Sequence, residues 1–345
     1  MFIEPLRWEG DTLRILDQTK LPQEEVYIPV PDPETLFEAI VNLRIRGAPL
    51  LGIAGAFGLY LGIRDFDSSH PGKFMERLRK VRDYLAKSRP TAVNLFWAMD
   101  RVVQRVEKEN LKDVEEMKRK VLEEALAILE EDKRLCERIG ESGAEIIEEE
   151  DSILTHCNAG GLATSGYGTA LAVIYKAKEQ GKKIVVYADE TRPLLQGARL
   201  TAWELRKAGI ETWVICDNTA GEVMREGRVK KVIVGADRIA SNGDTANKVG
   251  SYSLAVLAKY HSLPFYIAAP FSTIDFHLRR GEEIPIEERK KEEVLSFRGL
   301  RVAPGDVNAY NPAFDVVPHH LITAFITDRG IIYPPFPEGL SKLRE

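Results

Sequence analysis

The sequence predicts an α/β protein whose C-terminal part is built on a parallel sheet. Short segments rich in β-branched and aliphatic residues recur from residue 152 onwards, and helical patterns separate them. Strands that alternate with helices indicate a parallel sheet, and such sheets bind ligands at the carboxyl ends of their strands. The expected strands cover residues 152–155, 183–188, 211–216, 229–235, 264–269 and 321–327.

A smaller, mostly helical region with a short antiparallel sheet is expected before these strands. Residues 7–30 alternate polar and apolar residues around Gly10-Asp11 and Leu21-Pro22, which is typical of short antiparallel strands. Helical patterns follow over residues 33–44, from Pro49 onwards, and over 74–87, 92–107 and 111–147. We therefore expect two domains, 1–145 and 146–345, with the last of these helices connecting them.

The helix expected from Pro49 onwards contains four glycines, at positions 52, 55, 58 and 62. A glycine inside a helix costs about 0.5–1 kcal/mol relative to alanine, so its repeated use needs a reason. The spacing predicts that another helix or a ligand approaches this helix closely.

Length, composition and charge exclude several classes of protein. A chain of 345 residues is too long for one small core, and 44% hydrophobic with 29% charged residues is typical of a globular protein. The net charge of −5 gives no reason to expect a nucleic-acid-binding protein, which would need a basic stripe. Residues 1–10 lack the apolar core of a signal peptide. The most apolar run, residues 50–63, is shorter than the roughly 20 residues that span a bilayer, so we expect no membrane segment.

Cysteine usage and the absence of nucleotide motifs narrow the expected cofactors. Cys136, Cys157 and Cys216 are widely spaced, which argues against a zinc site or a disulfide framework and fits a reducing cytoplasm. The stretch from His156 to Gly161 does not match G-x-G-x-x-G, and no Walker sequence occurs. We therefore expect neither zinc nor a nucleotide cofactor such as NAD or ATP.

Cys157 and Asp237 are the candidate catalytic residues, because each follows an expected strand. A free cysteine is most often a small buried hydrophobe. Cys157, however, stands between a strand and an expected helix start at Gly160-Gly161, and a helix N-terminus favours the thiolate. Asp237 is either a turn residue or a partly desolvated acid with a raised pKa. Cys136 and Cys216 are interpreted as structural.

Three segments are candidate binding sites for a phosphate. Arg46-Gly47-Ala48 and Asn247-Lys248 each precede an expected helix, whose free N–H groups attract anions, and Arg89 lies between two helices. The alternative for each is an ordinary solvated side chain. Gln196, at the start of another helix, is a candidate for binding a sugar hydroxyl. Asp189 and Glu190 are interpreted as structural residues that hold Arg192 or Arg199.

Taken together, these segments resemble the methylthioribose-1-phosphate isomerases of methionine salvage, which are related to subunits of a translation-initiation exchange factor. The matching stretches are Arg46-Gly47-Ala48-Pro49, Arg89-Pro90-Thr91-Ala92-Val93-Asn94, Thr155-His156-Cys157-Asn158-Ala159-Gly160, Asp189-Glu190-Thr191-Arg192-Pro193 with Gln196-Gly197-Ala198-Arg199, Gly235-Ala236-Asp237-Arg238, and Asn242-Gly243-Asp244 with Asn247-Lys248. They occur in family order over nearly the whole chain.

The resemblance implies a homodimeric aldose–ketose isomerase, an intramolecular oxidoreductase, with a Rossmann-like C-terminal domain and no cofactor. It further implies that Asp237 is the proton donor and Cys157 its partner. The substrate-binding residues that it implies are Arg46, Gly47, Ala48, Arg89, Gln196, Asn247 and Lys248. The substrate would be 5-methylthio-ribose 1-phosphate, a small sugar phosphate, and the expected compartment is the cytoplasm.

Three other functions remain open from the sequence. A ribose 1,5-bisphosphate isomerase would need a second phosphate site. A regulatory subunit of the initiation exchange factor would not need both Cys157 and Asp237. A hydrolase that uses Cys157 with His156 is disfavoured, because adjacent residues of a strand point to opposite faces.

Overall fold

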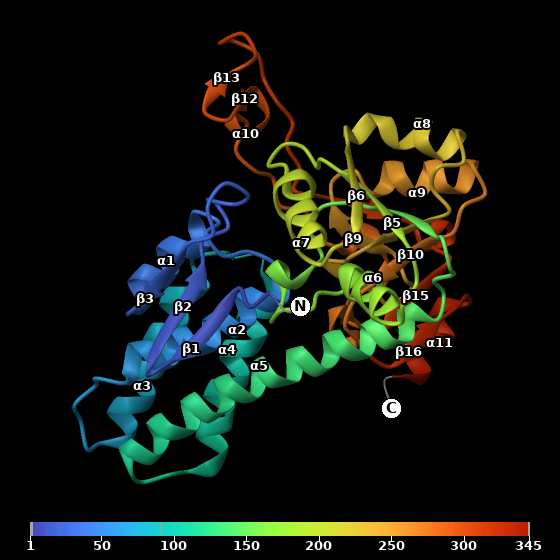
Figure 1. Cartoon of the computed structure of the whole chain (residues 1–345). Coiled ribbons are helices and arrows are strands. Elements are labelled where there is room, and N and C mark those ends of the chain that lie inside the picture. The colour runs from blue at the N-terminus through green and yellow to red at the C-terminus, as the bar shows by residue number, and fades with distance from the viewer. Residues whose placement is uncertain (1–2, 91, 344–345) are drawn as a thin grey trace. The chain divides into compact units, whose positions relative to one another are not determined.

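The computed structural model describes residues 3–90 and 92–343, and it divides the chain into two compact units (Figure 1). The first contains the chain up to Arg134 together with Gly161–Gly168, and the second contains Leu135–Gly160 and the chain from Thr169 onwards. The assignment of domains to 1–145 and 146–345 stays a prediction. Thr91, which belongs to one of the motifs singled out above, lies outside the described residues.

The first unit has the predicted antiparallel sheet followed by helices. Its elements are β1 (Leu6–Glu9), β2 (Thr12–Leu16), β3 (Tyr27–Val30), α1 (Pro33–Val41), α2 (Ala48–Ile63), α3 (Pro71–Ala86), α4 (Val93–Glu109) and the long α5 (Val114–Ala144), whose C-terminal turns belong to the second unit. The three strands pair in the order β1-β2-β3. Asp32 accepts a hydrogen bond from the Thr35 amide and so caps α1, with Pro33 in the first turn.

The four glycines of α2 are explained by helix packing and not by a ligand. A Cβ atom at Gly52 or Gly55 would lie 2.8 or 2.5 Å from atoms of α4. One at Gly62 would lie 2.6 Å from both methyl groups of Val81 on α3. Nearly every residue of α2 is buried, so this helix is the centre of the first unit.

The second unit is built on a seven-stranded sheet in the order β16-β15-β10-β7-β4-β5-β6. Its strands are β4 (Ser152–Thr155), β5 (Val185–Asp189), β6 (Glu211–Ile215), β7 (Lys231–Val234), β10 (Phe265–Ala268), β15 (Ala324–Thr327) and β16 (Gly330–Ile332). All neighbouring strands pair in parallel except β16, which is antiparallel to β15. The predicted fold class is therefore confirmed, and each of the six expected strands is present.

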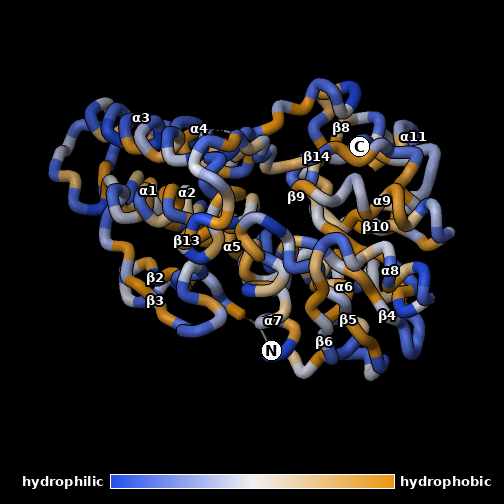
Figure 2. The backbone as a smooth tube through the Cα atoms, turned by 90° about the horizontal axis from the view of Figure 1, so that it is seen from above, coloured by the Kyte–Doolittle hydropathy of each residue, from blue (hydrophilic) through white to orange (hydrophobic). Residues whose placement is uncertain are grey.

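Helices cover both faces of this sheet, as alternating strand residues require. Leu154 contributes to the core on one face, with α8 (Ala220–Arg225), α9 (Ser251–Tyr260) and α11 (Phe336–Lys342). Its neighbour Ile153 contributes to the other, with α6 (Ala170–Glu179), α7 (Ala202–Lys207) and the end of α5. Figure 2 shows hydrophobic residues along the inner strands and hydrophilic residues on outer helices such as α8.

A second, four-stranded sheet in the order β11-β8-β9-β14 was not predicted. Its strands are β8 (Arg238–Ala240), β9 (Thr245–Lys248), β11 (Ile274–Asp275) and β14 (Phe314–Val317). They have only two to four residues each, and the turn residues around Asn242-Gly243 indicate a loop before a helix over residues 238–248 instead. Asp244 fixes the β8–β9 turn by accepting bonds from the Gly281 and His319 amides, 3.0 and 2.8 Å away. Later in the chain, the short helix α10 (Glu292–Leu295) precedes a small hairpin of β12 (Ser296–Phe297) and β13 (Leu300–Arg301).

Replacing Gly62 by alanine should destabilise the protein by about 1–3 kcal/mol, because the new methyl group overlaps the rigid side chain of Val81. Gly72, in the first turn of α3, is the control: a Cβ atom there meets nothing within 4 Å. Its replacement by alanine should raise stability by up to about 1 kcal/mol. Urea unfolding of both variants checks this, and equal effects would contradict the packing argument.

Candidate active site

Cys157 and Asp237 follow adjacent parallel strands at the centre of the large sheet. From β4 the chain proceeds to β5 and β6 on one side and to β7, β10 and β15 on the other, so the switch point lies between β4 and β7. Cys157 comes two residues after β4, and Asp237 comes three residues after β7. The two loops touch, since a Cβ atom at Gly235 would lie 2.9 Å from that of Ala159.

The backbone of Cys157 has an unusual, left-handed conformation, with φ of 61°. Its amide donates a hydrogen bond to Thr191 Oγ1 at 2.8 Å, and its carbonyl accepts one from Thr201 Oγ1 at 2.6 Å. The expected helix start at Gly160-Gly161 is wrong: Gly161–Ala163 form a single 3₁₀ turn, and α6 begins only at Ala170. The chain enters the first unit over Gly161–Gly168, so a helix N-terminus does not explain a reactive thiol.

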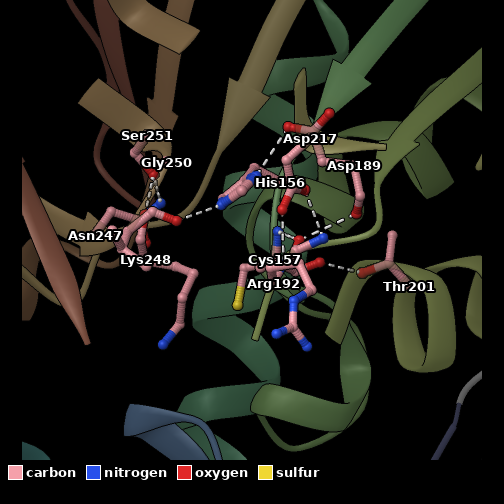
Figure 3. A network of polar contacts seen from close by, with 12 residues as sticks. His156, Cys157, Asp189, Arg192, Thr201, Asp217, Asn247, Lys248, Gly250 and Ser251 are labelled. Atoms are coloured by element: carbon pink, nitrogen blue, oxygen red, sulfur yellow. Dashed lines mark hydrogen bonds and ion pairs between the residues drawn. The ribbon is translucent and has the colours of Figure 1, made fainter. Parts of the chain in front are cut away.

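His156 is buried and bonded through both ring nitrogens (Figure 3). Nδ1 lies 2.9 Å from Asp189 Oδ2, and Nε2 lies 2.9 Å from the Val249 carbonyl oxygen. A carbonyl only accepts, so Nε2 carries a hydrogen. The ring also packs on Gly250, where a Cβ atom would lie 2.8 Å from Nε2. His156 therefore cannot act as a base for Cys157, which removes the hydrolase alternative.

Asp189 holds His156, whereas the sequence predicted Arg192 or Arg199 as its partner. Arg192 instead donates to the carbonyls of Pro193 and Val294, and Arg199 donates to that of Leu194. Burial raises the pKa of Asp189 to about 6, although the hydrogen bond from His156 acts in the opposite direction. Burial disfavours a charged His156, but the hydrogen bond and charge of Asp189 outweigh it and raise the pKa of His156.

Asp217 completes this cluster from the end of β6. Its two carboxylate oxygens accept hydrogen bonds from the amides of Thr191 and Arg192, each at 2.7 Å. The ligand atoms of His156, Asp189 and Asp217 lie within 4.8 Å of one another, a spacing that a metal ion would also fit. Most of these atoms already bond to the protein, so we interpret the cluster as structural.

Asn247 and Lys248 lie in β9. The prediction that they lie in a loop leading into a helix is therefore wrong. Asn247 is buried and donates to Ser251 Oγ at 2.8 Å, while Lys248 Nζ lies 5.2 Å from the centre of the Phe314 ring. Asp315 accepts hydrogen bonds from the Gly250 and Tyr252 amides, so these N–H groups at the start of α9 are not free for an anion. In Figure 3 the side chains of Lys248, Cys157 and Arg192 extend towards the same side of the network.

Gln196, a predicted ligand-binding residue, lies at the end of the loop after β5. It directly precedes η2 (Gly197–Thr201), a π-helical turn before α7, and π-turns are frequent at functional sites. The side chain is buried, and its Oε1 accepts no hydrogen bond from the described residues. A buried acceptor without a partner costs about 1–3 kcal/mol, and a ligand hydroxyl would remove that cost.

The other proposed binding residues belong to the first unit. Arg46, Gly47 and Ala48 lead into α2, and Arg89 lies between α3 and α4; all four are partly exposed. Gly47 has φ of 98°, and a Cβ atom there would lie 2.4 Å from Ala163 Cα, so glycine is required. Gln18, which the sequence did not suggest, donates to the Leu162 carbonyl at 2.7 Å.

The whole chain is similar to known isomerases. It is 52% identical to the methylthioribose-1-phosphate isomerase of Fervidobacterium nodosum, covering 99% of this chain and 97% of the relative. The 5-deoxyribose 1-phosphate isomerase of Moorella thermoacetica is also 52% identical, with the same coverage. Residues 44–334 match the Initiation factor 2 subunit family. The chain belongs to the methylthioribose-1-phosphate isomerase branch of that family.

Solved structures support the assignment. The 5-methylthioribose 1-phosphate isomerase of Pyrococcus horikoshii superposes with a TM-score of 0.93 at 45% identity, covering 99% of this chain and 95% of that one. A structure from A. fulgidus described as translation initiation factor eIF-2B, subunit delta, gives 0.90 at 45% identity, covering 99% of both chains. The predicted resemblance is confirmed, and with it the prediction that the chain is an isomerase.

The three cysteines, Cys136, Cys157 and Cys216, differ in burial. None of the three cysteines forms a disulfide bond with a described residue. Cys136 is buried as expected, but Cys216 is exposed, which contradicts a structural role for its side chain. Cys216 lies at the end of β6, an edge strand with an exposed face. Among the described residues, no helix is both long and apolar enough to cross a membrane.

Replacing Asp189 by asparagine should make stability less dependent on pH. Because its pKa rises from 3.8 to about 6 on folding, Asp189 stabilises the fold below about pH 4, and this is lost as the pH rises through 6. The raised pKa of His156 acts in the same direction, because the stability that it contributes is lost as the pH rises above 6.5. Between pH 4 and 7, the unfolding free energy of the native protein should fall relative to the variant by up to about 3 kcal/mol. Parallel pH curves in urea titrations would contradict this.

Proposed function

We propose that this isomerase converts 5-methylthio-ribose 1-phosphate into 5-methylthio-ribulose 1-phosphate, with Asp237 as proton donor and Cys157 as its partner. The observation that carries the proposal is the position of these two residues on either side of the switch point, on loops that touch through Gly235 and Ala159. The names of the relatives supply the substrate, and the family resemblance implies methionine salvage as the pathway.

The chemistry explains why an acid and a thiol are needed. The anomeric oxygen carries the phosphate, so the ring cannot open to a free aldehyde. A protonated Asp237 donates its proton to the ring oxygen while the bond between that oxygen and C1 breaks. The C2 hydrogen must then reach C1, and the C2 hydroxyl must lose its proton to become the ketone. No external oxidant or reductant is required.

Two routes for the hydrogen fit the same residues. In the first, the Cys157 thiolate takes the C2 proton, an enol phosphate forms between C1 and C2, and C1 is then protonated. In the second, hydride moves directly from C2 to C1 while Cys157 stabilises the cation. In both routes a site shielded from water helps to keep Asp237 protonated.

The binding roles follow from charge and burial. We assign the phosphate to Lys248 and a sugar hydroxyl to the buried Oε1 of Gln196, and the family resemblance implies that Arg46 and Arg89 also bind substrate. Gly47, Ala48 and Asn247 complete the set. A homodimer in the cytoplasm is part of the same proposal; three free cysteines support the compartment.

A second substrate is favoured by the relative from Moorella thermoacetica, which is named for 5-deoxyribose 1-phosphate. This sugar lacks the methylthio group but has the same C1 phosphate and C2 hydrogen, so the same residues can act on it. Ribose 1,5-bisphosphate adds a second phosphate at C5. Initial rates with the three sugars, without added metal, separate the candidates, and we expect methylthioribose 1-phosphate to give the highest kcat/KM.

The A. fulgidus structure raises a non-catalytic alternative, a regulatory subunit that binds an initiation factor. Such a subunit does not require the Cys157 and Asp237 pair, and the presence of both supports catalysis. Binding to an initiation factor without turnover of any of the three sugars would overturn the proposal.

Cys157→Ser and Asp237→Asn should each lower kcat by at least about 100-fold, because each removes a group that transfers a proton or stabilises the cation. Cys216→Ser, which changes the exposed thiol at the edge of the sheet, should keep near-native activity. Steady-state kinetics and circular dichroism check the three variants. Native rates for the first two would exclude them from catalysis.

Lys248→Ala should mainly raise KM, because the ammonium group is assigned to the phosphate and binds it before and during the reaction. The matched control is Lys259→Ala, an exposed lysine near the end of α9. A KM that does not change for Lys248→Ala would contradict the assignment.

A further inference from the structure

The conformation at Cys157 needs a physical cause within the protein. A residue other than glycine with φ of 61° is uncommon, and such backbone strain costs about 1–3 kcal/mol unless the surroundings impose it. The next strand along the chain ends in the same way, because Thr191 has φ of 64°. These two strained residues are hydrogen-bonded to each other.

Two buried threonines hold the peptide groups on both sides of Cys157. Thr191 Oγ1 accepts from the Cys157 amide at 2.8 Å, and Thr201 Oγ1 donates to the Cys157 carbonyl at 2.6 Å. Figure 3 shows the second of these contacts. Neither threonine is exposed to solvent, so water cannot replace either hydroxyl. The rotation about the Cα of Cys157 is thereby fixed from its two sides.

Each hydroxyl is itself held in place. Thr191 Oγ1 donates to the Asp189 carbonyl at 3.0 Å, and the Thr191 amide donates to Asp217 Oδ1 at 2.7 Å. Thr201 Oγ1 accepts from Asn158 Nδ2 at 3.2 Å, and that amide group also donates to Glu204 Oε1 at 2.8 Å. Both hydroxyls therefore donate one bond and accept another, which orients them unambiguously.

The π-helical turn Gly197–Thr201 places Thr201 where it can reach Cys157. A Cβ atom at Gly197 would lie 1.7 Å from the Asp189 carbonyl oxygen, so the start of this turn lies directly against the end of β5. Thr201, at the last position of the turn, then meets the loop that follows β4. The loop after β5 and the end of the π-helical turn thus converge on the two peptide groups that flank Cys157.

We propose that Thr191 and Thr201 are positioning residues that lock the left-handed backbone of Cys157 and so fix the direction of its thiol. The proposal rests on the proposed role of Cys157 in catalysis. Without either hydroxyl, one polar group of the Cys157 backbone is left buried and unpaired. The backbone then relaxes, and displacing a reacting group by about 1 Å can lower a rate about 100-fold.

The test compares valine and serine at each position. Valine keeps the shape of threonine but removes the hydroxyl, whereas serine keeps the hydroxyl. Thr191→Val and Thr201→Val should lower kcat about 10- to 100-fold with KM within about twofold, because substrate contacts remain. Thr191→Ser and Thr201→Ser should stay within about threefold of the native kcat.

A second readout does not depend on the reaction. The rate at which iodoacetamide alkylates Cys157, followed by peptide mass spectrometry, should change at least threefold in the valine variants and not in the serine variants. Thr323→Val is the matched control: its hydroxyl accepts from the Phe265 amide at 2.9 Å, at the opposite end of the sheet. It should lower thermal stability without changing kcat or the alkylation rate.

The outcomes separate the two proposals. Native kcat and alkylation rates in folded valine variants would overturn the positioning role. Loss of activity with unchanged alkylation would equally overturn it. A changed alkylation rate in a chain that turns over none of the sugars would support the positioning role while the proposed function fails. If the valine variants do not fold, hydrogen exchange of the Cys157 amide in the native protein decides: slow exchange supports the bond to Thr191, and fast exchange overturns it.

Discussion

The parallel pairing of β4 with β7 is the constraint on which the candidate site depends. Ile153 and Leu154 of β4 lie opposite Lys231 and Val232 of β7, and both strands are buried on their two faces. At this pair the connections reverse direction, so no crossover helix separates the ends of the two strands. The loops that follow them can therefore touch, and small residues, Ala159 and Gly235, bring them close together.

Near this pair of strands, buried polar groups connect the loops of the candidate site by hydrogen bonds. His156 connects the end of β5 to the segment after β9 through Asp189 and the Val249 carbonyl. Asp217 and the two threonines connect the ends of β5 and β6 to Cys157. Buried polar networks of this kind favour a single arrangement, because a buried group that loses its partner is costly.

The strands of the large sheet and most helices were predictable because they are apolar and periodic. Polar residues at strand ends indicated one edge of this sheet as a candidate site, and that location stays a prediction. The four-stranded sheet that contains Asn247 was not predictable, because polar and apolar residues alternate only weakly in its short strands, which resemble turns in sequence. The left-handed backbone at Cys157 was also hidden: it results from contacts with Thr191 and Thr201, which are distant in sequence. The partner of Asp189 was missed because nearby arginines were the more obvious choice than a histidine at position 156.

The contact between the imidazole of His156 and Gly250 joins two positions that are 94 residues apart. Any side chain at position 250 would strike the ring, and φ of 111° there already disfavours one. Conversely, a smaller residue at position 156 would leave a void beside the glycine. Neither position therefore tolerates substitution on its own, and libraries that randomise one of them alone should return the parental residue.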